Sequence, residues 1–143
     1  MRVSGANTAP CFTCYYCRRN QYQLCEHLFD EGMGIIGAYA ESVRIPGRLA
    51  KVNVFQIPEG APYEYAAFTE PLACVINAVE ETNVQMDDRV VVIGVGPIGL
   101  LFIESLSLKG VQKIVSIDTN KERLLLAKSM GADEVIDLEK RIQ

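Results

Sequence analysis

Four cysteines near the start of the chain constrain its fold more than any other feature. They follow the spacing Cys-x2-Cys-x2-Cys-x7-Cys and are Cys11, Cys14, Cys17 and Cys25. A loop this short has no apolar core of its own, so a bound metal would order it. Four thiolates match the ligand number and type of a closed tetrahedral zinc site, and the x2 spacing lets neighbouring cysteines point at one centre.

Disulfides, or a redox arrangement of the same thiols, are the competing interpretation. Disulfides belong to secreted chains, and Met1–Pro10 contains no apolar stretch that could form a signal-peptide core. We therefore expect a cytoplasmic protein and a structural zinc ion. The fifth cysteine, Cys74, lies in an apolar helical stretch and is predicted to be a small buried residue. His27 is predicted to be an exposed or packing residue, because four thiols already fill the site.

The second half of the chain has the pattern of a parallel α/β sheet. Its first strand, residues 89–93, is an apolar β-branched run of the kind that is buried on both faces. Strands and helices then alternate, with helices predicted at 98–109 and 121–130 and strands at 113–118 and 134–137. This βαβαβ order implies parallel strands with right-handed crossovers.

A glycine-rich turn joins the first of these strands to its helix. Gly94, Gly96 and Gly99 form Gly-x-Gly-x-x-Gly between a strand and a helix, which is the setting of a dinucleotide pyrophosphate site. We expect Gly94 to permit the tight turn, Gly96 the approach of phosphate, and Gly99 close helix–strand packing. Pro97 suits the first helical turn, where its missing N–H costs nothing.

An acid stands at the end of the second strand. Asp118 lies 19 residues after Gly99, where it could accept hydrogen bonds from both hydroxyls of an adenosine ribose. Its charge would repel a 2′-phosphate, so the sequence favours NAD over NADP. The alternative is that Asp118 caps the helix that begins near Lys121.

The first half of the chain is predicted to be rich in short strands. Strands are expected over 39–45, ended by Pro46-Gly47, and over 52–57, ended by Pro58. Helical spacing follows over 63–68 and 72–82, with Pro71 marking a break or a restart.

Charge and hydropathy argue against nucleic acid and membrane partners. The net charge is −4, and Arg18-Arg19, predicted to be a solvated turn, is the only basic pair in the first half. No apolar run reaches the roughly 18 residues that span a bilayer. A nucleic-acid-binding zinc finger would also leave residues 85–137 unexplained.

These features together resemble the zinc-dependent medium-chain dehydrogenase/reductase family, and within it the sorbitol and polyol dehydrogenase branch. The cysteine cluster resembles the family's structural zinc lobe, residues 37–46 its glycine-alanine-glutamate strand, and Glu70-Pro71-Leu72 the segment that joins its two domains. The implied fold class is α/β. It comprises part of a GroES-like, β-rich catalytic domain with a zinc lobe over 1–62, and the first half of a Rossmann NAD-binding domain over 63–143.

The resemblance also implies roles that spacing alone does not. Glu70 takes the position beside the catalytic zinc, where the family's glutamate acts on the zinc-bound water or ligates the metal. Without the resemblance, Glu70 is a carboxylate near a helix start. Ile98 and Arg123 take positions that contact the cofactor's pyrophosphate region and adenosine ribose. The implied cofactors are zinc and NAD, the substrate is a small alcohol or polyol, and the parent enzyme is a homo-oligomer, either a dimer or a tetramer.

Two departures from the family pattern lie in the zinc lobe, where Phe12 and Asn20 replace usual glycines. The family's catalytic-zinc cysteine and histidine–glutamate pair belong to segments that precede the equivalent of Met1. We therefore expect the 143-residue chain to be inactive by itself. The alternative is a non-catalytic module or truncated paralogue that binds zinc and a dinucleotide.

Overall fold

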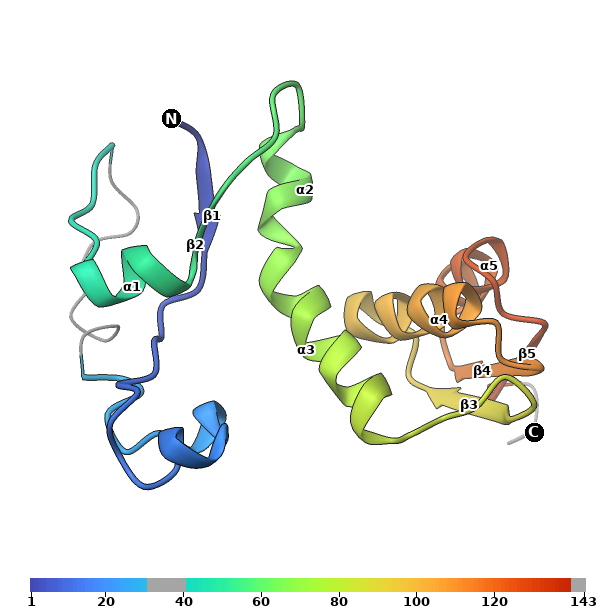
Figure 1. The fold of residues 1–143 in the computed structure, drawn as a ribbon. Helices are drawn as coiled ribbons and strands as arrows, with labels where there is room; N and C mark the ends of the chain where they lie inside the picture. Colours follow the sequence, from blue (N-terminus) through green and yellow to red (C-terminus); the bar gives the residue numbers. More distant parts are fainter. Residues whose placement is uncertain (31–40, 140–143) are drawn as a thin grey trace. The chain divides into compact units, whose positions relative to one another are not determined.

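A computed structural model describes residues 1–30 and 41–139 of the chain. The chain forms two compact units, Met1–Glu70 and Pro71–Gln143. Figure 1 shows the order of the elements along the chain. Among the described residues, no helix has both the length and the apolar character that a bilayer crossing needs.

The first unit contains one small antiparallel sheet. Strand β1 (Val3–Gly5) pairs with β2 (Val54–Gln56), with Ser4 opposite Phe55. Strand β2 confirms the centre of the strand predicted over 52–57. The strand predicted over 39–45 is wrong for its described part, because residues 41–45 form no strand; residues 39 and 40 lie outside the described residues.

Pro46-Gly47 opens a helix in addition to ending an extended segment. Helix α1 (Gly47–Val52) has the extended residue Pro46 at its N-cap and contains leucine, alanine, lysine and arginine, which favour helix. Leu49 anchors it as the largest fully buried side chain of the unit. The described part of the unit also contains two short 3₁₀ helices, η1 (Cys17–Arg19) and η2 (Tyr22–Leu24).

Helix α2 (Tyr63–Ala67) belongs to the first unit by its contacts. The guanidinium carbon of Arg2 lies 4.1 Å from the centroid of the Tyr63 ring, and Arg2 also donates to the carbonyl of Ala61. Ser4 Oγ donates to the carbonyl oxygen of Ala66 at 2.9 Å. These contacts join α2 to β1, and the domain boundary predicted after residue 62 stays a prediction.

Helix α3 (Thr69–Glu81) crosses the division between the two units. It confirms the helix predicted over 72–82 and begins three residues earlier. Pro71 lies in its first turn, where the missing N–H has no intrahelical partner to lose.

The second unit confirms the predicted βαβαβ order. Its sheet has the parallel strand order β3-β4-β5, with Ile93 opposite Ile117 and Asp118 opposite Asp137. The elements are β3 (Arg89–Ile93), α4 (Pro97–Lys109), β4 (Lys113–Asp118), α5 (Lys121–Ser129) and β5 (Glu134–Asp137). Helices α4 and α5 cover the same face of this sheet (Figure 1), as two right-handed crossovers in one direction require.

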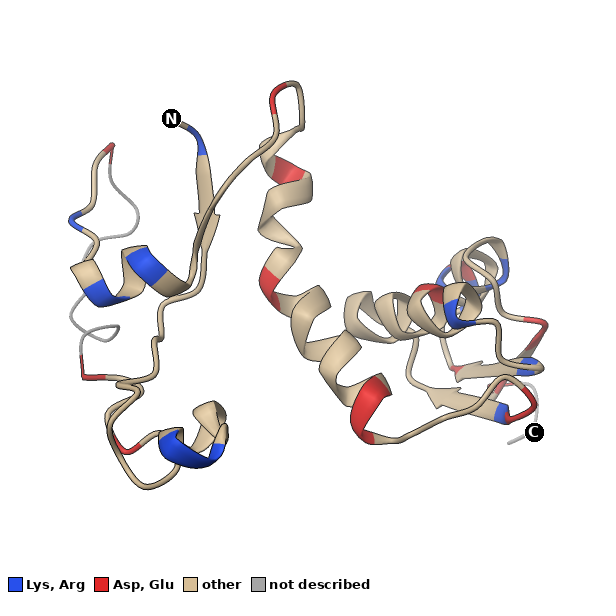
Figure 2. Cartoon of the chain, viewed as in Figure 1, with Lys and Arg blue, Asp and Glu red and all other residues tan. Residues whose placement is uncertain are grey.

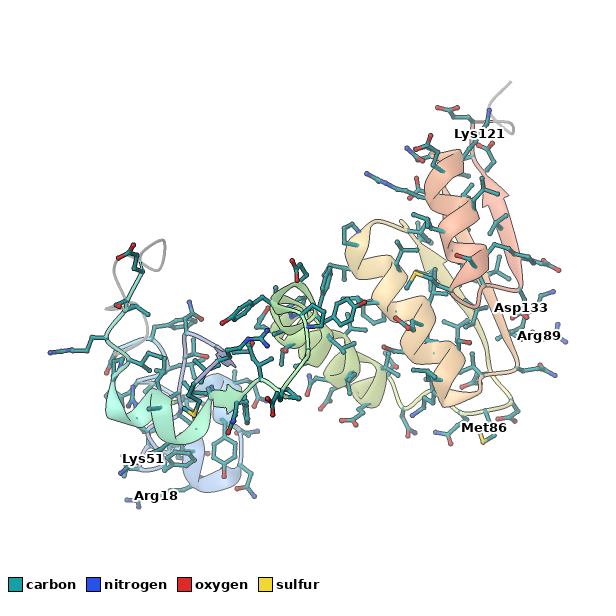
Figure 3. The ribbon with its side chains drawn as sticks, turned by 90° about the horizontal axis from the view of Figure 1, so that it is seen from above. Arg18, Lys51, Met86, Arg89, Lys121 and Asp133 are labelled. Carbon is teal, nitrogen blue, oxygen red and sulfur yellow. The ribbon has the colours of Figure 1, made fainter. Side chains whose placement is uncertain are left out.

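The core of the second unit lies between this sheet face and the helices. Ile103 of α4 and Ile114 of β4 are at most 1% exposed, and Val75 of α3 packs in the same cluster. The turn before β5 is fixed to the start of β4 because Asp133 Oδ2 accepts a hydrogen bond from the backbone N–H of Ile114 at 2.7 Å. Figure 3 labels Asp133 at this end of the sheet.

Two predictions about burial are wrong. Strand β3 is not buried on both faces, since Val91 and Ile93 are 55% and 77% exposed. Within the described residues of this unit, α4 and α5 lie on the opposite face of the sheet, which leaves the side chains of Val91 and Ile93 uncovered. Cys74 is exposed, because on α3 the positions that reach the core are Val75 and Val79.

Candidate metal centre and dinucleotide-binding site

Residues 11–30, hereafter the lobe, bring the four cysteine sulfurs together. Their Sγ atoms all lie within 4.8 Å of one another, and the Cys11–Cys17 and Cys14–Cys25 pairs are both 3.9 Å apart. None of the four forms a disulfide in the structure. The core of the lobe consists of three of these sulfurs, with Tyr16 and Leu28 packed against it, so its order depends on what the sulfurs bind.

The separations match a tetrahedral zinc ion. With a zinc–sulfur bond of about 2.3 Å, tetrahedral geometry sets neighbouring sulfurs about 3.8 Å apart. The Cys11–Cys17 and Cys14–Cys25 pairs, both at 3.9 Å, are close to this value without any backbone rearrangement. The donor set of four thiols is also the one zinc prefers in closed structural sites. The residues therefore fit the metal that the spacing predicts.

Backbone N–H groups surround the sulfurs as they do in metal–thiolate loops. Cys25 Sγ accepts from the N–H groups of Cys11 and His27, each at 3.3 Å, and Cys11 Sγ accepts from Cys14 N at 3.3 Å. Thr13 adds a side-chain hydroxyl, 3.4 Å from Cys11 Sγ. Such donors stabilise negative charge on sulfur and orient the ligands. The role of Thr13 was not predicted, although a hydroxyl residue between two cluster cysteines is visible in the sequence.

The thiols differ in acidity because their surroundings differ. The Thr13 hydroxyl and backbone hydrogen bonds lower the pKa of Cys11 to about 5. The backbone N–H of Cys17 lowers the pKa of Cys14. Burial raises the pKa of Cys17 to about 12. A metal ion brought among the four would offset this burial cost, because a coordinating thiol loses its proton.

The side chain of His27 lies outside the cluster, as predicted. Its Nδ1 lies 2.8 Å from Asp30 Oδ2, and its side chain is 51% exposed. The hydrogen bond and charge of Asp30 raise the pKa of the imidazole. Arg18, in the same lobe, is exposed and labelled at the outer margin of Figure 3. The exposure of Arg18 agrees with the predicted solvation, but Arg18-Arg19 belongs to the 3₁₀ helix η1, and the guanidinium carbon of Arg19 lies 3.7 Å from the centroid of the Tyr15 ring.

The glycine-rich turn of the second unit has the predicted form. Gly94 has φ +84°, so it uses a backbone conformation that side chains disfavour. A side chain at Gly99 would overlap the carbonyl oxygen of Gly94, whereas one at Gly96 would enter open space. Gly96 is the N-cap of α4, and no side chain of the described residues caps this helix. Its first N–H groups can therefore face an anion.

Pro97 and Ile98 begin α4, as the sequence predicts. Pro97 is its first residue, and Ile98 is 50% exposed beside the open turn. The side chain of Val95, which lies between Gly94 and Gly96, is fully buried and anchors the turn in the core.

Asp118 is joined to the glycine-rich turn by a hydrogen bond. Its Oδ2 accepts from the backbone N–H of Val95 at 2.8 Å, and its Oδ1 accepts from Asn120 N at 2.8 Å. These two backbone donors, Asn120 first, lower the pKa of Asp118, so the carboxylate is ionised at neutral pH. Only 9% of the residue is exposed. The alternative role as a helix cap is wrong, because Asn120 Oδ1 caps α5 by accepting from Arg123 N at 3.0 Å.

The remaining candidates lie apart from these contacts. Arg123 is an exposed residue in the first turn of α5, and its charge is a small further cause of the low pKa of Asp118. Figure 2 shows both signs of charge on α5, as expected for a solvated helix face. Glu70 is exposed in the first turn of α3, and among the described residues it belongs to no group of three or more potential metal ligands.

Comparisons with known proteins agree with this geometry. No family model matches the chain. The chain is 34% identical over 139 residues to the erythritol/L-threitol dehydrogenase of Mycolicibacterium smegmatis, covering 96% of this chain and 38% of that protein. Sorbitol dehydrogenase of Arabidopsis thaliana is 33% identical over 138 residues, covering 96% and 37%. The chain thus spans less than two fifths of the length of these curated relatives.

A solved structure shows the same fold. Alcohol dehydrogenase TADH from Thermus sp. ATN1 superposes with a TM-score of 0.78 and 37% identity, covering 96% of this chain and 42% of that one. In sequence and in structure, nearly the whole chain is thus similar to part of the zinc-dependent alcohol, sorbitol and threonine dehydrogenases of the medium-chain dehydrogenase/reductase family.

Proposed function

We propose that the chain supplies the structural zinc lobe and the adenosine-binding part of an NAD(H)-dependent alcohol or polyol dehydrogenase. The reaction is hydride transfer from a secondary alcohol or polyol carbon to the nicotinamide. The observation that carries the proposal is the 2.8 Å hydrogen bond from Val95 N to Asp118 Oδ2, because it holds the acid against the glycine-rich turn. In support, an Escherichia coli CFT073 alcohol dehydrogenase solved with NADH superposes with a TM-score of 0.75 at 28% identity, covering 99% of this chain and 42% of that one.

The residues of the turn suit a pyrophosphate and a ribose. The uncapped N-terminus of α4 offers backbone N–H groups and a partial positive charge to an anion. Asp118 is ionised and retains lone pairs on both oxygens, so it can accept from ribose hydroxyls. Its charge disfavours a 2′-phosphate, which supports NAD over NADP. Ile98 offers an apolar contact, and Arg123 a cation, at the edge of this site.

Two metal roles enter the proposal. Cys11, Cys14, Cys17 and Cys25 hold a structural zinc that orders the lobe and does no chemistry. In the parent enzyme, bound catalytic zinc and NAD supply Lewis acidity and hydride acceptance. Glu70 is the one residue of this chain proposed for that catalytic centre, where its carboxylate would hold a proton or ligate the metal. We further propose a small-molecule alcohol or polyol substrate, a homo-oligomeric parent and a cytoplasmic location, with neither nucleic acid nor membrane as partner.

A second function is a non-catalytic module that binds zinc and a dinucleotide. The observation that favours it is the shortage of catalytic-zinc ligands in this chain. Its one histidine, His27, pairs with Asp30 in the lobe, and Glu70 belongs to no group of three or more potential metal ligands among the described residues. This module and the dehydrogenase share the same two binding sites. They differ in whether the chain turns over an alcohol.

The test combines zinc analysis, cofactor titration and an activity assay on the purified chain. We expect about one zinc per chain, as a single closed site requires, and its loss in Cys25→Ser. We expect NADH to bind, as fluorescence titration would show, and Asp118→Asn to bind more weakly. We expect no NADH formation from sorbitol or erythritol by the chain alone. Polyol-dependent NADH production would contradict both the expected inactivity and the module, and absence of NADH binding would remove the dinucleotide site.

A further inference from the structure

The four sulfurs of the lobe differ in their access to solvent. Cys17, Cys25 and Cys14 are 4%, 7% and 9% exposed. Cys11 is only half-buried, and the next two residues, Phe12 and Thr13, are exposed. Oxidation of cysteine follows thiolate character and accessibility. A small oxidant arriving from water therefore meets Cys11 first.

The sulfur placed to respond is that of Cys17. Its Sγ lies 3.9 Å from Cys11 Sγ, while Cys14 Sγ lies at the same distance from Cys25. A disulfide bond is about 2.05 Å long, so the Cys11 and Cys17 sulfurs need to approach by about 2 Å, which side-chain rotation can supply. Of these two pairs at 3.9 Å, the Cys11–Cys17 pair contains the most exposed of the four cysteines, Cys11.

We propose that Cys11 is a peroxide-sensitive modification site, and that its oxidation closes a Cys11–Cys17 disulfide and releases the zinc of the lobe. This inference rests on the structural zinc of the proposed function. The oxidant is a hydroperoxide, with hydrogen peroxide as its simplest member. The consequence is a reversible loss of order in the lobe, because Cys14 and Cys25 alone are too few ligands for a closed site.

The chemistry balances without a further reactant. The Cys11 thiolate attacks one peroxide oxygen, the O–O bond breaks, and the departing hydroxide takes a proton to become water. The resulting sulfenic acid is attacked by the Cys17 thiolate, the S–S bond forms, and a second hydroxide leaves as water after protonation. Two thiolates are oxidised by two electrons in total, and one peroxide is reduced to two waters. A thiol reductant reverses the step, and added zinc then rebinds.

The experiment uses the zinc-loaded chain and less than one equivalent of hydrogen peroxide. Released zinc is measured with a chromogenic chelator, after which free thiols are alkylated and the chain is digested with trypsin. Cleavage at Arg18 and Arg19 places three cluster cysteines in the peptide of residues 3–18 and Cys25 in that of residues 20–44. Cys74 lies in the separate peptide 52–89 and serves as an internal reference thiol.

We expect one disulfide per zinc released, closed within the peptide 3–18, with Cys14 and Cys25 alkylated. Cys74→Ser is the matched control, and we expect it to leave zinc release unchanged. A first disulfide that joins the two peptides, or oxidation of Cys74 before zinc release, would overturn the inference. Retention of zinc with Cys11 unoxidised would do the same. Zinc content is measured before peroxide is added, so an absent metal site, which contradicts the proposed function, is distinguished from a present site that oxidises in another order.

Discussion

Phe12 holds a backbone conformation that its side chain disfavours. Its φ is +61°, close to the +60° of Asn20, and both replace glycines of the family pattern. A left-handed conformation costs an ordinary L-residue about 1–2 kcal/mol, whereas asparagine is among the residues that adopt it routinely. The Phe12 ring packs edge-on against Tyr22, with centroids 5.6 Å apart, a contact of about 0.5–1.5 kcal/mol. The aromatic contact therefore offsets much of the backbone cost.

This balance predicts the order of two substitutions at residue 12. Phe12→Ala loses the ring but keeps the Cβ, while Phe12→Gly loses both. We expect Phe12→Gly to bind zinc more tightly than Phe12→Ala by about fivefold, since the left-handed penalty of about 1 kcal/mol falls on alanine only. Competition with a chelator of known affinity measures the difference. At a right-handed position alanine would be the better residue, so the reverse order would contradict the assigned backbone conformation.

Asp118 makes stability depend on pH in a predictable direction. Its pKa is lowered in the folded chain, chiefly by the N–H groups of Asn120 and Val95. Its contribution is therefore fully present above the unfolded pKa, near the ordinary value of 3.8, and is lost as pH falls through the lower folded pKa. We expect Asp118→Asn to destabilise the chain by about 1–3 kcal/mol at neutral pH and by less in acid. Urea unfolding of both chains at a series of pH values checks this, and a pH-independent difference would contradict it.

At the scale of elements, the two halves of the chain differ in how well their sequence predicts them. The boundaries of β3, α4, β4, α5 and β5 match the predictions to within one residue. Each is a periodic segment ended by a turn signal, and each contacts elements that are near it in the sequence. The first unit depends on contacts between distant residues. Strand β1 has three residues and is defined by pairing with β2 some fifty residues later, which no local pattern reveals.

The candidate sites divide in the same way. The cysteine spacing and the glycine pattern predicted which residues form the two candidate sites, because the residues of each pattern lie close together in the sequence. Asn120 caps α5 in place of Asp118 for a reason that the local sequence does not show. Asp118 instead accepts a hydrogen bond from the N–H of Val95, which lies in another segment. Thr13 and the N–H groups around the sulfurs likewise depend on the folded turn. Spacing identifies ligands, whereas the contacts that hold them arise from tertiary structure.

Gly96 and Gly99 separate the packing role of the glycine-rich turn from its binding role. A Cβ at Gly99 would overlap Gly94 O, so we expect Gly99→Ala to push α4 from β3 and cost about 1–3 kcal/mol. Gly96 has φ −69° and open space around it, so Gly96→Ala should fold normally. Its added methyl group would occupy the approach to the helix N-terminus and weaken NADH binding. Thermal unfolding and NADH titration of both variants measure the two effects, and equal unfolding temperatures would contradict this division of roles.

On the scale of the whole molecule, the chain displays an uncovered strand. In the described residues β3 pairs with β4 on one side only. A groove of about 430 Å³ lies along it, lined by apolar side chains from β3 and from α4, including Phe102 and Leu106. Val91 and Ile93 are exposed on the same strand. An edge strand with unpaired backbone groups and apolar side chains is a template for pairing with another chain.

We therefore expect the 143-residue chain to self-associate as its concentration rises from micromolar to millimolar values, the range in which exposed strand edges cause aggregation. Val91→Lys should reduce the association, because a lysine on an edge strand opposes pairing. Leu125→Lys is the matched control, since Leu125 is 73% exposed on α5 and lies outside the groove. Sedimentation velocity over a concentration series measures the species present. If Leu125→Lys reduced association as strongly as Val91→Lys, general hydrophobicity and not the β3 edge would be the cause. A wild-type chain that stayed monomeric throughout would show that the edge does not pair with a second copy.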